Sequence, residues 1–188
     1  GVEALNDLES ITGDGKTGMY LLASQSHSRK GKRTKSRTAM VAVEQTGTSF
    51  QAKAVQFLAD SLESAGPQFL TSLGLSNGTR DLEIEGMTFH LGSLYLGLKS
   101  PLDAAGNGII WRMKKPAEFL ESGDILQGAL SLWGTAKLPA KIQGKSVSGG
   151  ISELLFLPDG GLLISSTPST GNGSTTSGYL SFAKNPMG

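Results

Sequence analysis

Residues 81–101 read DLEIEGMTFHLGSLYLGLKSP, and this stretch decides the fold class. Apolar residues occupy nearly every second position on both sides of Gly92-Ser93, which is the period of half-buried strands. Gly92-Ser93 interrupts the alternation with residues that favour turns. Pro101 ends the second run, because proline cannot donate a hydrogen bond to a strand ladder. The stretch therefore predicts two strands joined by a tight turn.

The same pattern occurs once before this stretch and once after it. Residues 7–26 read DLESITGDGKTGMYLLASQS, and residues 150–168 read GISELLFLPDGGLLISSTP. In each copy a carboxylate opens a first run, a glycine-containing turn follows, and a second apolar run completes the pair. Glu9, Glu85 and Glu153 are the opening carboxylates, at intervals of roughly 70 residues, and such a period indicates a repeat architecture.

These repeats predict an all-β fold, a β-propeller with three blade-like units that form a partial ring. The units cover residues 7–57, 81–143 and 149–188 of a single propeller portion. The first two are longer than the about 40–50 residues of ordinary four-stranded blades, so they contain insertions. An ordinary antiparallel sandwich, in which the repetition is coincidental, is the alternative.

Residues 55–75 predict a minor helical insertion between the first two units. Apolar residues recur there at helical spacing before Gly66-Pro67, a pair that ends a helix. These apolar residues are Val55, Leu58, Ala59 and Leu62.

The number of units has a structural consequence, because propellers close with about 4–8 blades. Three units leave open sheet edges, whose unpaired backbone groups favour self-association. Either the chain is a fragment of a longer propeller, or two copies complete a ring; the sequence favours the fragment.

Several motifs resemble an uncharacterised bacterial family, a domain of unknown function, and the resemblance spans nearly the whole chain. The matching motifs, in the order of the family, are Asp7-Leu8-Glu9, Ser26-His27-Ser28, Ile84-Glu85-Gly86, residues 96–101 (LGLKSP) and residues 150–154 (GISEL). Members look like β-propellers related to esterase-like phytase and regucalcin-like propellers. The resemblance implies membership and says little about activity.

The chain departs from the family pattern at three places. Ser10 stands where the family favours glycine, Lys99-Ser100 where it favours Arg-Gly, and Ser152-Glu153 where it favours Arg-Asp. Roles that rest on those arginines therefore do not transfer to this chain. Family members are also longer than this chain, which is the reason for favouring a fragment.

Composition excludes several function classes. The net charge is +1, which gives no global field for nucleic acid or membrane surfaces. The chain has no cysteine, which excludes disulfides, thiol catalysis and zinc–thiolate sites. No apolar run approaches the about 20 residues of a membrane span. The cytoplasm and the periplasm, the latter after removal of a signal segment, are both compatible with this composition.

The opening carboxylates are the first candidate site. The innermost strands of propeller blades line a central channel, so Glu9, Glu85 and Glu153 are expected to point toward one axis. Clustered carboxylates attract a cation, and calcium takes 6–8 oxygen ligands. The sequence thus suggests a calcium site, or a water-filled channel, with Asp7 or His27 assisting. The alternative is structural: each glutamate caps backbone amides or pairs with Lys99.

A basic loop at residues 27–37, HSRKGKRTKSR, is the second candidate. Its positive charges favour phosphate or another anion, but no aromatic residue is interleaved for base stacking. A solvated loop is the simpler interpretation, and nucleic acid is not expected as a partner. The charged residues are Arg29, Lys30, Lys32, Arg33, Lys35 and Arg37.

Two functions follow from these patterns. The first is a binding module that presents loops around a central channel to a protein or a small-molecule ligand. The second is an enzyme, a calcium-assisted phosphoester or ester hydrolase, by analogy with phytase-like and esterase-like propellers; fold analogy is a weak warrant for function. His27 beside Ser26 and Ser28 does not make a catalytic triad, because no nucleophile elbow is present.

Overall fold

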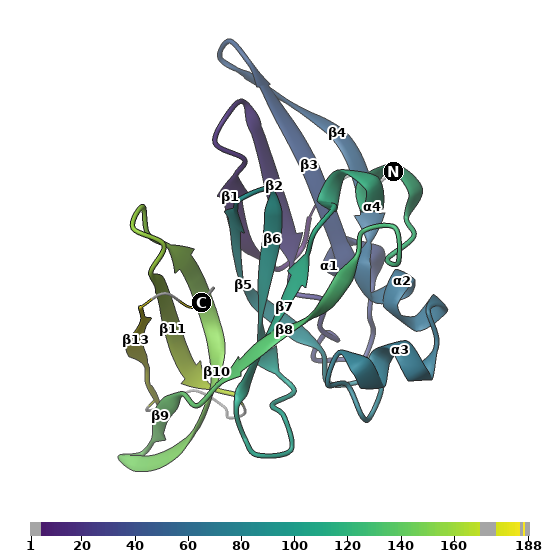
Figure 1. Ribbon diagram of the computed structural model, residues 1–188. Coiled ribbons are helices and arrows are strands. Elements are labelled where there is room, and N and C mark those ends of the chain that lie inside the picture. The colour runs from purple at the N-terminus through teal and green to yellow at the C-terminus, as the bar shows by residue number, and fades with distance from the viewer. Residues whose placement is uncertain (1–4, 170–175, 185, 187–188) are drawn as a thin grey trace.

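The computed structural model describes residues 5–169, 176–184 and 186, and it shows an all-β chain with three antiparallel sheets of four, four and five strands (Figure 1). The first sheet has the order β1-β2-β3-β4. Its strands are β1 (Leu8–Gly13), β2 (Gly18–Ala23), β3 (Ala39–Thr46) and β4 (Ser49–Phe57). The second sheet has the order β5-β6-β7-β8. Its strands are β5 (Glu83–His90), β6 (Ser93–Ser100), β7 (Gly108–Met113) and β8 (Leu130–Ala136).

The hairpin predicted from residues 81–101 is confirmed as β5 and β6. The register pairs Met87 with Leu96 and Phe89 with Leu94 across the two strands. The turn falls at Leu91-Gly92, both with positive φ, where glycine at Gly92 adopts the left-handed region without a Cβ penalty.

The third sheet is built differently from the other two. Its order is β12-β9-β10-β11-β13. The middle strand, β10, pairs with β9 on one side and with β11 on the other. Its strands are β9 (Pro139–Ile142), β10 (Lys145–Phe156), β11 (Leu162–Pro168), β12 (Thr176–Ser177) and β13 (Tyr179–Ala183).

The prediction of three blade-like propeller units in a partial ring is therefore wrong. β10 is one continuous strand of 12 residues, and its first part pairs with β9 while its second part pairs with β11. The sequence placed residues 139–142 in the second unit and began the third at Gly149, but Gly149 and Gly150 lie inside β10. A strand shared in this way makes a five-stranded sheet instead of a repeated four-stranded blade.

The second sheet lies between the other two, and its strands β6 and β7 are mostly buried on both faces (Figure 1). On one face Leu94, Leu96 and Leu98 of β6 join a core formed with the first sheet. On the other face Tyr95 packs with Ile151 and Phe156 of the third sheet. This two-sided burial explains why β6 is buried from Ser93 through Leu98.

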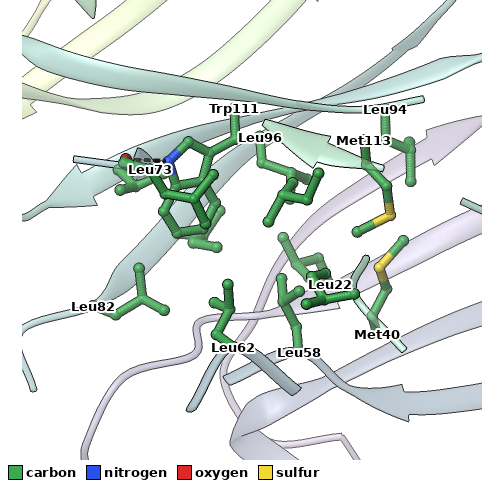
Figure 2. Packing of buried hydrophobic residues seen from close by; sticks show 14 of the residues in the cluster. Leu22, Met40, Leu58, Leu62, Leu73, Leu82, Leu94, Leu96, Trp111 and Met113 are labelled. Carbon is green, nitrogen blue, oxygen red and sulfur yellow. Dashed lines mark hydrogen bonds between the residues drawn. The ribbon is translucent and has the colours of Figure 1, made fainter. Parts of the chain in front are cut away.

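Helices close one end of the core between the first two sheets. They are α1 (Lys35–Thr38), α2 (Leu58–Ser64), α3 (Pro67–Ser72) and α4 (Pro116–Ser122). α2 and α3 fall within the segment predicted to be helical, and Leu58 and Leu62 are fully buried. Figure 2 shows these two leucines on the same side of the core as Met40, pointing toward Trp111 and Leu96 of the second sheet.

Trp111 anchors the same core from β7. Its side chain is fully buried, and its indole Nε1 donates a 2.8 Å hydrogen bond to the carbonyl oxygen of Leu73 (Figure 2). The bond satisfies the one polar group of the ring, which would otherwise be buried at a cost. No helix of the described residues is long and apolar enough to cross a membrane.

Candidate functional site

The first strands of the two four-stranded sheets and the long strand of the third sheet meet along one line, because β5 contacts both β1 and β10. Five carboxylates lie on or beside these strands, and we call this set the carboxylate face. They are Asp7, Glu9, Glu83, Glu85 and Glu153. With three sheets in place of a ring of blades, the face is the junction of the sheets and not the wall of a central channel.

Two cations border the carboxylate face. Arg37 pairs with Asp7, and its guanidinium also donates to the carbonyl oxygen of Ser26 at 3.1 Å. Lys99 Nζ lies 3.2 Å from Glu85 Oε2, and only 12% of the Lys99 side chain is exposed. The structural alternative predicted from the sequence, pairing with Lys99, is thus confirmed for Glu85.

Lys99 is held by hydroxyl groups as well as by Glu85. Its ammonium donates to Ser152 Oγ at 3.1 Å and also to Thr167 Oγ1. Ser152 and Thr167 are hydrogen-bonded to each other at 2.7 Å. All three donor positions of this ammonium are therefore used within the protein.

Glu9 is the most perturbed member of the face. The pKa of Glu9 is raised to about 7, mainly by burial and also by the nearby carboxylates of Asp7, Glu85 and Glu83, against a smaller lowering by Arg37. Within the described residues, the Glu9 carboxylate has no hydrogen bond or ion pair. The charged form of Glu9 is therefore unfavourable in the free protein.

Glu83 and Glu153 are shifted in the same direction. Burial raises the pKa of Glu83, and the charge of Glu85 adds to the effect, while Lys99 opposes it. Burial also raises the pKa of Glu153, although hydrogen bonds lower it in part. These bonds include the backbone N–H of Leu154 at 2.9 Å and the Ser10 hydroxyl at 3.5 Å. Glu153 thus meets the capping role suggested as the structural alternative, whereas Glu83 has no such partner in the described part of the chain.

The calcium hypothesis finds no ready ligand set. Across residues 5–169 and 176–184, no group of three or more carboxylate or imidazole side chains is arranged to hold a metal ion. A calcium ion needs several oxygens converging at 2.3–2.6 Å. The carboxylate face provides negative charge without that convergence.

His27 lies apart from the carboxylate interactions. Its Nδ1 is 3.1 Å from the carbonyl oxygen of Arg80, and the residue is exposed. It contributes to none of the raised carboxyl pKa values. The structure therefore gives His27 a local contact to the loop before β5.

The basic loop divides into anchored and exposed residues. Arg33 donates to Glu63 and Thr79, and only 10% of its side chain is exposed. With Arg37, it ties the loop to the rest of the fold. Lys35 lies over the ring of Phe57, 4.8 Å from the centroid. Arg29, Lys30 and Lys32 are all exposed, as a solvated loop requires.

Sequence reasoning missed three residues of the site. Glu83 precedes Glu85 by two positions, so strand alternation could have placed both on one face. Ser152 and Thr167 had no such signal, because their meeting depends on the pairing of β10 with β11.

A cavity of about 400 Å³ lies away from the carboxylate face, between α2 and the end of α4, with Asp60 and Asp124 at its walls.

Comparisons with known proteins give no relative for this chain. No protein-family model, curated protein or solved structure matches it. The resemblance to a bacterial domain family stays a prediction.

Proposed function

We propose that this protein is a binding module, and that its ligand presents a positively charged group to the carboxylate face. The observation that carries the proposal is the state of Glu9 and Glu83. Both are partly buried among like charges, and neither has an ion-pair or hydrogen-bond partner within the described residues. Such groups are costly when ionised, and a bound cation would remove that cost.

An organic cation fits this proposal better than a metal ion. An ammonium or guanidinium donates several hydrogen bonds in different directions and does not need six converging oxygens. A lysine or arginine side chain of a protein partner, or a small-molecule amine, has this chemistry. Arg37 and Lys99 already use it when they pair with Asp7 and Glu85.

The test is a titration with two named probes, a short lysine- and arginine-containing peptide and calcium chloride, followed by calorimetry. We expect the peptide to bind, and Glu9→Gln to weaken it about tenfold, which corresponds to about 1.4 kcal/mol. Glu44→Gln is the matched control, because Glu44 pairs with Lys53 elsewhere on the first sheet and both are exposed. Equal weakening by both variants would show a general charge effect and contradict the proposal.

A second candidate is a calcium-assisted phosphoester or ester hydrolase. The raised pKa of Glu9, about 7, favours it, because a general acid or base works best near the operating pH. Its test is hydrolysis of p-nitrophenyl phosphate and p-nitrophenyl acetate with calcium and with chelator. Calcium-dependent turnover that Glu9→Gln abolishes would favour the enzyme over the binding module; no turnover would leave binding as the function.

A further inference from the structure

The second and third sheets do not pack evenly against each other. One row of paired residues crosses all four strands of the second sheet, and the row consists of Gly86, Gly97, Ile110 and Gly134. Residues that are paired directly across antiparallel strands point to the same face of the sheet. Ile110 belongs to the core with the third sheet, so the whole row faces the third sheet.

The glycines of this row show where the two sheets touch and where they separate. A Cβ added at Gly86 would lie 3.2 Å from Ile151 Cγ2, and a Cβ at Gly97 would collide with the same methyl group. A Cβ at Gly134 would meet no atom within 4 Å. The third sheet therefore lies against β5 and β6, whereas a gap opens beside β8, the edge strand of the second sheet.

The gap is a cavity of about 220 Å³ between the two sheets. Its walls are formed by Ile110, Trp133 and Gly134 from the second sheet and by Leu162, Ile164 and Ala183 from the third. Packed protein interiors contain few voids larger than a water molecule, so a cavity of this size is unusual between two sheets. Its walls are small or apolar side chains from both sides of the gap.

Water is a poor occupant of this cavity. None of the described residues that line it is charged, and the polar side-chain groups among them are the Trp133 indole N–H and the Thr135 hydroxyl. An ordered water needs about 2–4 polar partners. An apolar group that displaces weakly held water gains affinity.

Trp133 forms an aromatic wall of the cavity. Its ring packs edge-on against Tyr95 and Phe156, with 5.1 Å and 6.2 Å between ring centroids, and these contacts fix its orientation. Trp133 is half-buried, so part of the ring is not covered by the rest of the protein. A planar ligand ring can therefore pack against an indole that is already held in place.

We propose that this cavity, which we call the Trp133 cavity, binds a small, uncharged aromatic molecule. The lining argues against a charged ligand, because a buried charge without a partner is costly. The volume sets the size, since an apolar cavity of about 150 Å³ is enough for benzene. The Trp133 cavity thus has room for one ring or a fused pair of rings. This site is separate from the carboxylate face and does not depend on the function proposed for it.

The test is an NMR titration with indole, an uncharged fused ring. The chain has two tryptophans, whose indole N–H signals are assigned with Trp133→Phe. We expect indole to shift the Trp133 signal with a dissociation constant below about 1 mM, which is ordinary for so small a ligand. The Trp111 signal should stay in place, because Trp111 is fully buried in the other core. Benzoate, which is charged, and cyclohexanol, which is not planar, should bind at least about tenfold more weakly.

Two variants fill the cavity from opposite walls. Gly134→Leu places a side chain in the space that is empty at Gly134, and Ala183→Leu does the same from the third sheet. Each should weaken indole binding at least about tenfold. Ser131→Leu is the matched control, because Ser131 is an exposed residue of β8 that does not line the cavity. Circular dichroism shows which variants are folded.

Several outcomes would overturn the proposal. With the wild type, these are an unshifted Trp133 signal up to about 5 mM indole, equal shifts of both tryptophan signals, or affinity for benzoate or cyclohexanol equal to that for indole. With the variants, they are unchanged indole binding in a folded Gly134→Leu or Ala183→Leu protein, or an equal loss of binding in Ser131→Leu. The ligand series uses the unmodified chain, so it decides the question even if a filled variant does not fold.

Discussion

At the scale of single residues, the carboxylate face shows how burial and like charges at one sheet junction can raise the pKa of several carboxyl groups. Glu85 is neutralised by Lys99, and Asp7 is neutralised by Arg37. Glu9 lies close enough to both acids to feel their charge but, among the residues that the structure describes, has no ion-pair partner of its own. The same strands thus contain two ion pairs beside a carboxylate whose charge is not balanced. A cationic ligand would gain the most binding free energy at that carboxylate, Glu9.

Glu9→Gln should change how stability depends on pH. The folded-state pKa of Glu9 is raised from 4.5 to about 7, so the folded protein binds a proton more tightly than the unfolded chain. Between these two values the free energy of unfolding contributed by Glu9 falls as pH rises. We expect Glu9→Gln to match the wild type near pH 4 and to be more stable at pH 8 by about 1 kcal/mol, after allowance for solvent screening.

Urea unfolding at a series of pH values measures this difference. Glu83 and Glu153 have pKa values raised in the same direction, so some pH dependence should remain in the variant. Glu44→Gln serves again as the control for removal of one negative charge. A Glu9→Gln curve that runs parallel to the wild type at all pH values would show that Glu9 titrates normally.

At the scale of elements, the close approach of β6 and β10 depends on small residues. A Cβ added at Gly97 would meet the Cγ2 methyl of Ile151 and would lie 3.1 Å from Leu154 Cδ1. A Cβ at Gly150 would collide with the backbone carbonyl of Lys99. Glycine at these two positions therefore lets β6 and β10 approach closely enough for Lys99 to donate a hydrogen bond to Ser152.

Gly97→Ala should destabilise the protein by about 2 kcal/mol, the usual cost of inserting a methyl into a packed core. Gly134→Ala in β8 is the matched control, since nothing lies within 4 Å of its Cβ position. Adding Ile151→Ala to Gly97→Ala should cost less than the sum of the two single changes, because the methyl would then have room. Thermal or urea unfolding measures the wild type and the four variants; additive losses would place the strain elsewhere.

The elements also show where sequence reasoning succeeded and where it failed. Alternation identified β5 and β6 because their hairpin is local. Helical spacing identified α2 because its buried residues Leu58, Ala59 and Leu62 recur three to four residues apart. Sequence reasoning failed at Gly149-Gly150, which read as a start signal but lies within β10. Alternation predicts that a segment is a strand but not which strand it pairs with, so it could not predict that β9 pairs with β10. For the same reason it could not predict that Ser152 and Thr167 meet in the site, whereas Glu9, Glu85 and Glu153 were found by their repeated position.

At the scale of the whole molecule, β6 joins two cores. One face of the strand packs toward the first sheet and the helices, and the other packs toward the third sheet. Because β6 contributes side chains to both cores, unfolding of one core would expose one face of a strand that the other core also needs. This shared strand is the physical reason to expect the three sheets to unfold together.

The two tryptophans test this cooperativity, because each reports on a different core. Trp111 is fully buried between the first and second sheets, whereas Trp133 packs edge-on against Tyr95, 5.1 Å between ring centroids, in the core with the third sheet. In Trp133→Phe, fluorescence reports the first core alone; in Trp111→Phe, it reports the second. We expect the fluorescence midpoint in urea to coincide with the far-ultraviolet circular dichroism midpoint in each variant.

Trp111→Phe should have the lower midpoint of the two, because it leaves the Leu73 carbonyl oxygen without its 2.8 Å donor. A Trp133 signal that changes at lower urea than the dichroism would mean that the third sheet unfolds first, and that β6 does not couple the two cores.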